Sequence, residues 1–403
     1  LPLGISFFTF QQIAFLVDVY YERTKEENII YYSIFVCFFP QLIAGPIIQH
    51  NQIRDQLYHI KNNEINIWKN LANGLILITI GLFKKVIIAD KLAIWSDKMF
   101  YVAYSGEVVT FIEAWLGVLC FTFQIYFDFS AYSDIAIGLG LLFGLKLPVN
   151  FLSPYKSKSI IEFWRTWHIT LSNFFKNYVY IPLGGNNSGY IKQAKNLIIV
   201  MFLAGLWHGA GWTFIIWGLF HGILLLMNHL YRKFKYILKV NEKKLIYFYQ
   251  FFTFVLVSLG WVLFRSPDIE TAFSVYKGVF GINGLSLPSH YQFLFGNSVI
   301  DFTDIGITFT SLKSYGGGYQ VLWVFLMLLF VWFLPNSDQI STSLNSNRIE
   351  IKENNILFNI LGKTQFIKKN IDYLIAIIIS TILIVITIKI IEGKQGEFIY
   401  FQF

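Results

Sequence analysis

The chain has 403 residues and a formal net charge of +8, and hydrophobic residues make up 55% of it. Charged residues make up only 14%, whereas soluble domains carry about 25%. Aromatic residues add up to 19%, so the chain holds more apolar surface than one or two water-soluble cores could bury. These proportions argue against a soluble enzyme, a disordered protein or a fibrous repeat. They predict a membrane protein, and the length accommodates on the order of ten crossings.

Runs of apolar residues predict where the chain enters the membrane. The expected segments are residues 1–20, 29–49, 71–95, 108–127, 132–147, 196–230, 245–264, 320–334 and 371–391. The second half of 71–95 carries four charged residues and is therefore expected at the membrane interface. The chain opens on Leu1 inside an apolar run with no charged segment before it, so we expect that it is truncated at its N-terminus.

Basic residues are concentrated in three polar connections. Lys and Arg outnumber Asp and Glu in residues 148–195, 231–244 and 345–370, whereas acidic residues prevail in 266–319. Because loops rich in Lys and Arg stay in the cytoplasm, we expect the first three connections there and residues 266–319 outside. Membrane orientation, and not nucleic-acid binding, thus accounts for the net charge.

Residues 196–230 would have to leave the cytoplasmic side and return to it within 35 residues. Two complete crossings need about 40 residues and a turn. The segment is therefore predicted to be a re-entrant or broken-helix hairpin, with its break at Gly205, Gly209 and Gly211. Non-helical backbone at membrane depth is tolerated where it lines a cavity, so His208, among these glycines, is expected to face one.

Three of the seven histidines, His168, His208 and His221, lie in or beside this segment. An ionisable residue inside a membrane is a candidate functional residue, because burying it costs free energy. The alternative for each is a hydrogen-bonded histidine of the core. A metal site is not expected, since His208 and His221 lack the helical spacing of metal ligands and have no Cys, Glu or Asp beside them.

Other motifs of soluble enzymes are missing from the sequence, including the nucleophile elbow, the P-loop and the dinucleotide fingerprint.

Gly138, Gly140 and Gly144 predict close packing of helices through small residues. Asp128 and Asp134 lie between apolar runs, and two interpretations stay open. They orient a basic partner or line a donor channel, or else they cap a helix that begins near Ser133.

Eight stretches, spread from the first residue to the last, carry a family resemblance. They are LPLGISFFTFQ (1–11), FFPQLIAGPI (38–47), GLFKKVIIAD (81–90), YFDFSAYSDIAIGLG (126–140), NFLSPYKSKSIIEFWRTWHITLSNFFKNYVYIPLGGN (150–186), GLWHGAGWTFIIWGLFHG (205–222), GWVLFR (260–265) and FIYFQF (398–403). In this order they resemble the membrane-bound O-acyltransferase (MBOAT) family, in its branch of alginate and peptidoglycan O-acetyltransferases. The resemblance implies an all-α polytopic membrane protein of the MBOAT fold, with about 8–10 membrane-associated helices and re-entrant segments around a central tunnel.

The resemblance also implies one MBOAT domain over residues 1–403. Within it we expect N-terminal membrane helices in 1–147 and a catalytic core with the re-entrant region in 148–230. Residues 231–403 are expected to hold the C-terminal membrane helices, with one extracytoplasmic loop at 266–319.

Matched by position, the catalytic histidine of the family falls on His208 and a second functional histidine on His168. A neutral histidine in a desolvated tunnel suits a general base, because its ordinary pKa lies near working pH. His208 is therefore expected to deprotonate the acceptor hydroxyl while His168 positions donor or acceptor, and a transient acetyl-enzyme is an open variant. Thr166 stands where relatives often carry a second Arg, which weakens one anion contact. Supporting or substrate-binding roles are expected for His221, Trp207, Arg165, Trp164, Asp128 and Asn173.

The implied reaction moves acetyl groups from a cytoplasmic thioester, with acetyl-CoA as donor substrate, to hydroxyls of an extracytoplasmic polysaccharide. It proceeds directly or through a periplasmic acyltransferase partner, in the bacterial inner membrane. Membrane lipid is an expected partner, whereas nucleic acid, a bound cofactor and a metal are not. Four basic residues either hold the phosphates of acetyl-CoA or are ordinary cytoplasmic charges: Lys156, Lys158, Arg165 and Lys176.

Two other functions stay open. One is a D-alanyl transferase of the same superfamily that takes its acyl group from a carrier protein. The other is a transporter without acyl chemistry, although the sequence shows no internal repeat of the kind found in many transporters.

Overall fold

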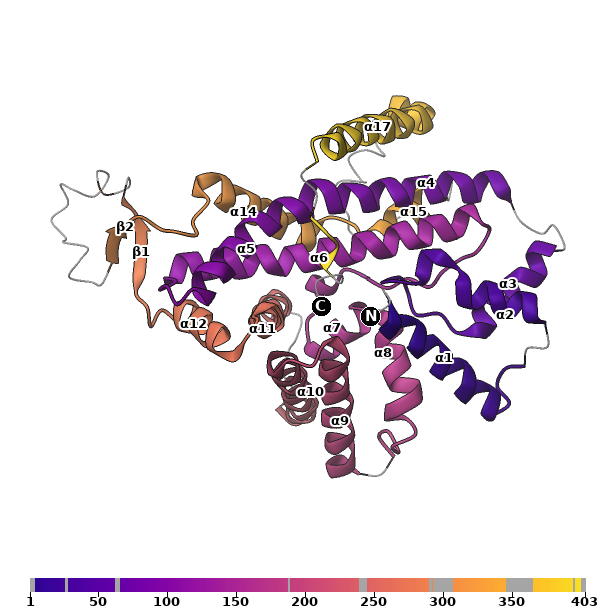
Figure 1. Ribbon diagram of the computed structural model, residues 1–403, viewed down its shortest axis with the longest axis horizontal. Coiled ribbons are helices and arrows are strands. Elements are labelled where there is room, and N and C mark those ends of the chain that lie inside the picture. Colours follow the sequence, from indigo (N-terminus) through magenta and orange to yellow (C-terminus); the bar gives the residue numbers. More distant parts are fainter. Residues whose placement is uncertain are drawn as a thin grey trace.

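A computed structural model describes residues 4–25, 28–61, 66–187, 189–238, 245–289, 292, 307–345, 365–393 and 396–399. Apart from one small sheet, the regular elements in these ranges are helices (Figure 1). Four helical stretches are long and apolar enough to cross a membrane: Ile67–Tyr104, Phe111–Leu142, Trp212–Phe234 and Ile246–Arg265. Shorter apolar helices accompany them, as an all-α membrane protein requires.

The central element is α6 (Phe111–Leu142), one continuous helix of 32 residues. A capping box between Thr110 and Glu113 starts it. We expected two segments here, 108–127 and 132–147, and that expectation is wrong. Asp128 and Asp134 lie inside α6, so the interpretation of these carboxylates as caps of a later helix is wrong as well.

Two helical stretches run along α6 (Figure 1). They are α4 (Ile67–Phe83) and α5 (Asp90–Tyr104), which are joined by the π-helical turn η2 (Lys84–Ala89). Lys84 and Lys85 in this turn are each only 6% exposed. Two of the four charges that led us to expect an interfacial position are therefore inside the protein, whereas Asp90 and Lys91 are half-buried.

Small residues let α4 and α6 approach each other closely. A Cβ atom added to Gly74 would lie 2.7 Å from the Gly138 carbonyl oxygen, and one added to Gly138 would lie 2.7 Å from that of Gly74. The predicted packing through small residues is thus confirmed at Gly138. Gly140 instead faces the turn after α6, where a Cβ would lie 2.9 Å from the Leu145 carbonyl oxygen.

The N-terminal part consists of α1 (Ile5–Tyr20), α2 (Ile29–Cys37) and α3 (His50–Lys61). The predicted segment 29–49 is helical only in its first part. Phe38 takes an extended conformation that ends α2, and the 3-10 turn η1 (Phe39–Gln41) contains Pro40, which lacks a backbone donor.

Four short elements follow α6 and lead into a helical hairpin. They are η3 (Pro154–Lys156), α7 (Ile160–Thr166), α8 (Ile169–Phe175) and the π-helical turn η4 (Lys176–Tyr180). The hairpin itself consists of α9 (Tyr190–His208) and α10 (Trp212–Leu238), which project away from α6 in Figure 1.

The predicted break of the hairpin is confirmed at Gly209 and Gly211, because α9 ends at His208 and α10 begins at Trp212. It is wrong at Gly205, which lies inside α9. The expected length of 35 residues is wrong, since α9 has 19 residues and α10 has 27. α9 begins before the predicted segment and α10 ends after it, and both extensions are polar and basic, so hydropathy did not count them as part of a membrane segment. Of the two helices, only α10 is among the described helices that are both long and apolar enough to cross a membrane.

The C-terminal part packs around this frame. Its elements are α11 (Ile246–Arg265), α12 (Ile269–Val279), the parallel pair β1 (Leu285–Pro288) and β2 (Ile307–Thr310), α14 (Gly317–Phe333), α15 (Ser337–Asn345) and α17 (Gln365–Ile391). The predicted segments 245–264, 320–334 and 371–391 coincide with α11, α14 and α17. The sides of the membrane assigned to the connections stay predictions.

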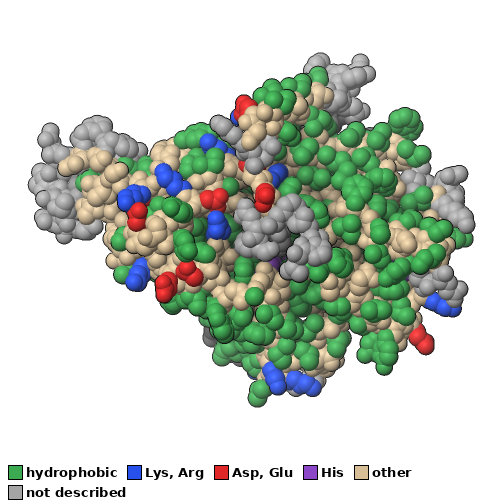
Figure 2. Space-filling view, in the orientation of Figure 1, with side chains coloured by type: hydrophobic (Ala, Val, Ile, Leu, Met, Phe, Trp, Pro, Cys, Tyr) green, Lys and Arg blue, Asp and Glu red, His purple; other side chains and the backbone are tan. Residues whose placement is uncertain are grey.

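Hydrophobic side chains cover most of the face that Figure 2 shows, and charged side chains occupy only a few places on it. Several large apolar residues are strongly exposed, among them Trp68 at 80% and Trp212 at 70%. Soluble monomers rarely expose apolar patches of more than a few hundred Å². The surface is thus that of a membrane protein.

Candidate active site

The structure brings two of the three histidines together. His208 is the last residue of α9, and His168 directly precedes α8. The Trp207 indole contacts both rings, with its centroid 4.8 Å from that of His208 and 6.2 Å from that of His168. The predicted residues His168, Trp207 and His208 therefore form one cluster where α9 meets the loop before α8.

The His168 ring lies in an aromatic enclosure and is 1% exposed. Phe129 contacts it edge-on at 4.7 Å between centroids, and Phe7 stacks on it at 6.2 Å. Burial, helped by the nearby His208, lowers the pKa of His168 well below its ordinary value. The imidazole is therefore neutral at physiological pH.

The backbone of His168 is held in the left-handed region, with φ of 43°. Residues other than glycine rarely adopt this conformation, and it persists where surrounding structure imposes it. On either side of the histidine, the Ile169 N–H donates to the Asn150 carbonyl at 3.0 Å and the Leu152 N–H donates to the Thr166 carbonyl at 2.9 Å. This short ladder places the His168 ring in its enclosure.

His208 is half-buried and lies where α9 breaks. Its ring contacts Trp217 and Phe264, at 5.1 and 5.0 Å between centroids. A helix C-terminus carries partial negative charge and favours a nearby cation. The helix end therefore offsets part of the free energy that burial costs a protonated imidazole at this place.

His221 lies behind the two histidines and is fully buried, with 0% exposure. Neither ring nitrogen has a hydrogen-bond partner among the described residues. Trp217 contacts both His221 and His208, in each case at 5.1 Å between centroids. The other aromatic neighbours of His221 are Phe163, Trp164, Phe220 and Trp261. His221 and Trp164 thus pack against Trp217, which in turn contacts the His208 ring.

Asp128 lies outside this cluster and has a different partner. Its Oδ1 is 2.7 Å from Lys85 Nζ, and its Oδ2 accepts from the Ile399 N–H at 2.8 Å. Of the interpretations left open, orientation of a basic partner is confirmed for Asp128.

The predicted anion-binding residues do not all point to solvent. Lys156 is half-buried, and its Nζ donates to the Leu334 carbonyl at 2.7 Å. Lys158, Arg165 and Lys176 are exposed. Only these three remain available to a phosphate.

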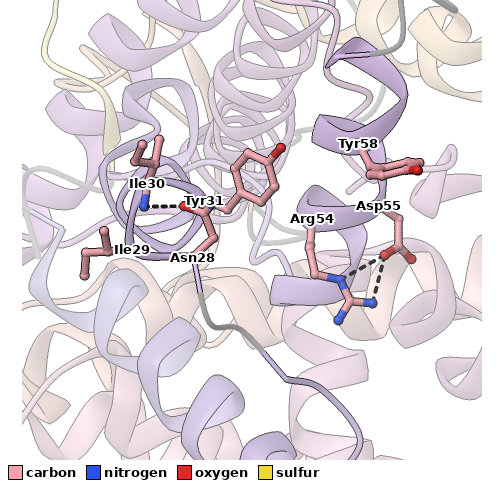
Figure 3. A pocket seen from close by; sticks show the side chains of 7 residues that line it. All are labelled: Asn28, Ile29, Ile30, Tyr31, Arg54, Asp55 and Tyr58. Carbon is pink, nitrogen blue, oxygen red and sulfur yellow. Dashed lines mark hydrogen bonds and ion pairs between the residues drawn. The ribbon is translucent and has the colours of Figure 1, made fainter.

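The structure has a polar cavity beside α8 and a larger hollow away from the histidines. The first, of about 310 Å³, is polar and contains the predicted residues Asn173 and Lys176 together with Thr170. The second, of about 570 Å³, is an open hollow beside α2 and α3 that holds no histidine (Figure 3). Its lining residues are Asn28, Ile29, Ile30, Tyr31, Arg54, Asp55 and Tyr58.

Three residues of the cluster were not predicted as site residues: Asn150, Trp217 and Trp261. All three lie in stretches that carry the family resemblance, which is the signal that could have found them. Their contacts with the histidines come from separate segments, which no single stretch reveals. In the part of the chain that the structure describes, no three His, Cys, Asp or Glu side chains gather as metal ligands would.

The sequence model of MBOAT, the membrane-bound O-acyltransferase family, matches residues 5–264, which include all of these site residues. The chain is 47% identical over 316 residues to the peptidoglycan O-acetyltransferase of Helicobacter pylori, covering 71% of this chain and 58% of that protein. It is 42% identical over 288 residues to a protein of Azotobacter vinelandii named "probable alginate O-acetylase AlgI", covering 71% and 55%. A teichoic acid D-alanyltransferase of Streptococcus thermophilus is 28% identical over 254 residues, which cover 60% of each chain. The chain thus spans little more than half the length of these relatives. It belongs to the membrane-bound O-acyltransferase family.

Proposed function

We propose that this protein is a membrane-bound O-acetyltransferase that acetylates hydroxyls of an extracytoplasmic polysaccharide. The observation that carries the proposal is the pairing of His168 and His208 around Trp207, inside the segment matched by the family. The two most similar relatives described above are named for transfer of O-acetyl groups to peptidoglycan and alginate. These polymers define the class of acceptor.

In the proposed reaction, His208 accepts the proton of the acceptor hydroxyl while the hydroxyl oxygen attacks the thioester carbonyl carbon. A carbon–oxygen bond forms, the carbon–sulfur bond breaks, and the imidazolium returns its proton to the leaving thiolate. The neutral His168 ring supplies a hydrogen-bonding nitrogen beside the reacting groups. Its aromatic enclosure excludes water, which would otherwise hydrolyse the thioester.

The donor in this proposal is acetyl-CoA, reached from the cytoplasmic side, with no bound cofactor. Lys158, Arg165 and Lys176 are exposed on the segment between α6 and α9 and supply positive charge for its phosphates. The protein acts in the bacterial inner membrane in contact with lipid. The hydroxyl that attacks the thioester belongs to the polymer itself or to a periplasmic acyltransferase partner that passes the acetyl group on to the polymer.

The D-alanyl transferase relative is more distant, at 28% identity. Family membership favours acyl transfer over transport. Alanyl transfer is therefore a result that the experiment can detect, and we do not propose it as a second function.

The test expresses the wild-type chain and a His208→Ala variant in a bacterial host and measures ester groups on purified envelope polymers by mass spectrometry. Removal of a general base lowers the rate by about 100-fold or more, so acetyl esters should disappear in the variant. The control is His59→Ala, which changes an exposed histidine on α3. Unchanged acetylation by a folded His208→Ala protein would overturn the proposal. Alanyl esters in place of acetyl esters would show that the acyl donor is a D-alanyl carrier protein and not acetyl-CoA.

A further inference from the structure

The side chain of Asn150 sits at the centre of a buried hydrogen-bond network around His168. Asn150 lies between α6 and η3 and is 0% exposed. Its Oδ1 is 3.1 Å from His168 Nδ1, 3.2 Å from the Thr170 backbone nitrogen and 3.0 Å from Thr170 Oγ1. One carboxamide oxygen therefore meets three groups from the turn that starts α8.

The identity of the atom facing His168 follows from its other neighbours. A backbone N–H can only donate, so the Asn150 atom beside the Thr170 nitrogen must be an acceptor, which is the carbonyl oxygen and not the amide nitrogen. Thr170 Oγ1 already accepts from the Ile47 N–H at 3.0 Å, which leaves its own hydrogen to donate to Asn150 Oδ1. The amide nitrogen lies on the other side and donates to Ser133 Oγ at 3.3 Å.

An acceptor oxygen next to His168 Nδ1 requires a proton on that nitrogen. The neutral ring then carries its lone pair on Nε2. His168 Nε2 is buried and has no hydrogen-bond partner among the described residues. The great majority of buried polar side-chain atoms have a partner, so an unpartnered acceptor at this place is suited to a group that arrives with a substrate.

We infer that Asn150 is a positioning residue that holds the His168 imidazole in the Nδ1–H tautomer. It thereby presents the Nε2 lone pair to a hydrogen-bond donor of the substrate other than the reacting hydroxyl, whose proton goes to His208. The backbone carbonyl of Asn150 accepts from Ile169 and fixes the left-handed turn at His168. Ring orientation and tautomer are thus set by one residue. The catalytic consequence rests on the proposed function, whereas the tautomer itself does not.

A carboxamide differs from a carboxylate in this position. An aspartate would also accept from Nδ1, but its negative charge would stabilise the imidazolium and raise the pKa of the ring. Asn150 fixes the tautomer without adding that charge. Replacing Asn150 by Asp therefore separates the two effects.

The experiment labels the full-length protein with ¹⁵N-histidine in detergent micelles and reads the tautomer of His168 from the ¹⁵N shifts of its ring, assigned by loss of the signal in His168→Gln. The wild type should show a single Nδ1–H tautomer. Asn150→Ala should shift the ring to a mixture or to the Nε2–H form, and Asn150→Asp should keep Nδ1–H but titrate at higher pH. The control Asn196→Ala removes another buried asparagine, which donates to the Leu183 and Gly185 carbonyls, and should leave the His168 signal unchanged.

Acetyl transfer by the same variants gives the second readout. Asn150→Ala should lower kcat by about tenfold or more with KM nearly unchanged, and Asn150→Asp should recover part of the rate with an altered pH profile. A wild-type His168 in the Nε2–H form, or an Asn150→Ala protein with an unchanged tautomer, would overturn the inference. If instead the tautomer shifts as expected but no variant or wild-type protein transfers acetyl groups, the inference about Asn150 stands and the proposed function fails.

Discussion

Trp207 contacts both candidate catalytic histidines, which differ in their surroundings. His168 is closed in by aromatic rings and tied to Asn150, whereas His208 is half-buried at a helix end. Sequence and family resemblance together singled out His168 and His208, which the structure places on either side of Trp207. They could not show the role of Asn150, because its partners His168 and Thr170 are brought to it by the turn before α8.

The buried state of His168 makes stability depend on pH. Its pKa is lowered in the folded protein, so between that value and the ordinary value of about 6.5 the unfolded chain binds more protons. Stability should therefore be complete above about pH 6.5 and should be lost as the pH falls below it, by up to about 1.4 kcal/mol per pH unit for this one group. Thermal unfolding of wild type and His168→Gln between pH 7.5 and 5.5 should show the shallower fall in the variant. Parallel curves would contradict this account.

At the scale of an element, local sequence patterns predicted the break in the α9–α10 hairpin but not the continuity of α6. Gly209 and Gly211 marked its break correctly, because glycine loses more conformational freedom in a helix than other residues do. The continuity of α6 was missed, because Asp128 and Asp134 look like interruptions in a hydropathy profile. Their lysine partners come from η2, more than 40 positions earlier in the chain, and no local window contains both members of a pair.

Close contact between α9 and α10 depends on Gly218. A Cβ atom there would lie 2.2 Å from the Met201 carbonyl oxygen, whereas a Cβ at Gly211 would meet nothing nearer than 3.6 Å. Gly218→Ala should therefore destabilise the protein by about 1–3 kcal/mol, since the backbones must move apart. Gly211→Ala is the matched control and should change the unfolding temperature little. Equal melting temperatures for the two variants would show that the hairpin tolerates separation.

Buried ion pairs connect distant segments at the scale of the whole molecule. Lys84 Nζ lies 2.6 Å from Asp134 Oδ2, and Ser337 Oγ donates to Asp134 Oδ1 at 2.8 Å, so η2, α6 and α15 meet at one carboxylate. Hydropathy predicted a membrane protein and the family resemblance implied its all-α fold. Neither could predict these pairings, which depend on three-dimensional assembly. The same holds for the contact of Asp128 with Lys85.

Loss of one partner from such a pair leaves an uncompensated buried charge. Asp134→Ala should therefore lower the free energy of unfolding by about 3–5 kcal/mol. Asp97→Ala removes an exposed pair with Arg265, whose atoms are 2.7 Å apart, and should cost only about 0–1 kcal/mol. Unfolding of the three proteins in the same detergent gives the comparison. A small effect of Asp134→Ala would mean that Lys84 finds another partner or water.

The bond between Asp128 and the Ile399 N–H spans 271 positions of the sequence, and this separation bears on how the protein is made. A ribosome adds about 5–20 residues per second, so roughly 15–50 s pass between the synthesis of the two partners. During that interval α6 is already made, while the Asp128 carboxylate has Lys85 as a partner but not the backbone donor that completes its coordination. Membrane insertion of this chain therefore passes through a state in which a central carboxylate lacks a backbone donor that is made 271 positions later.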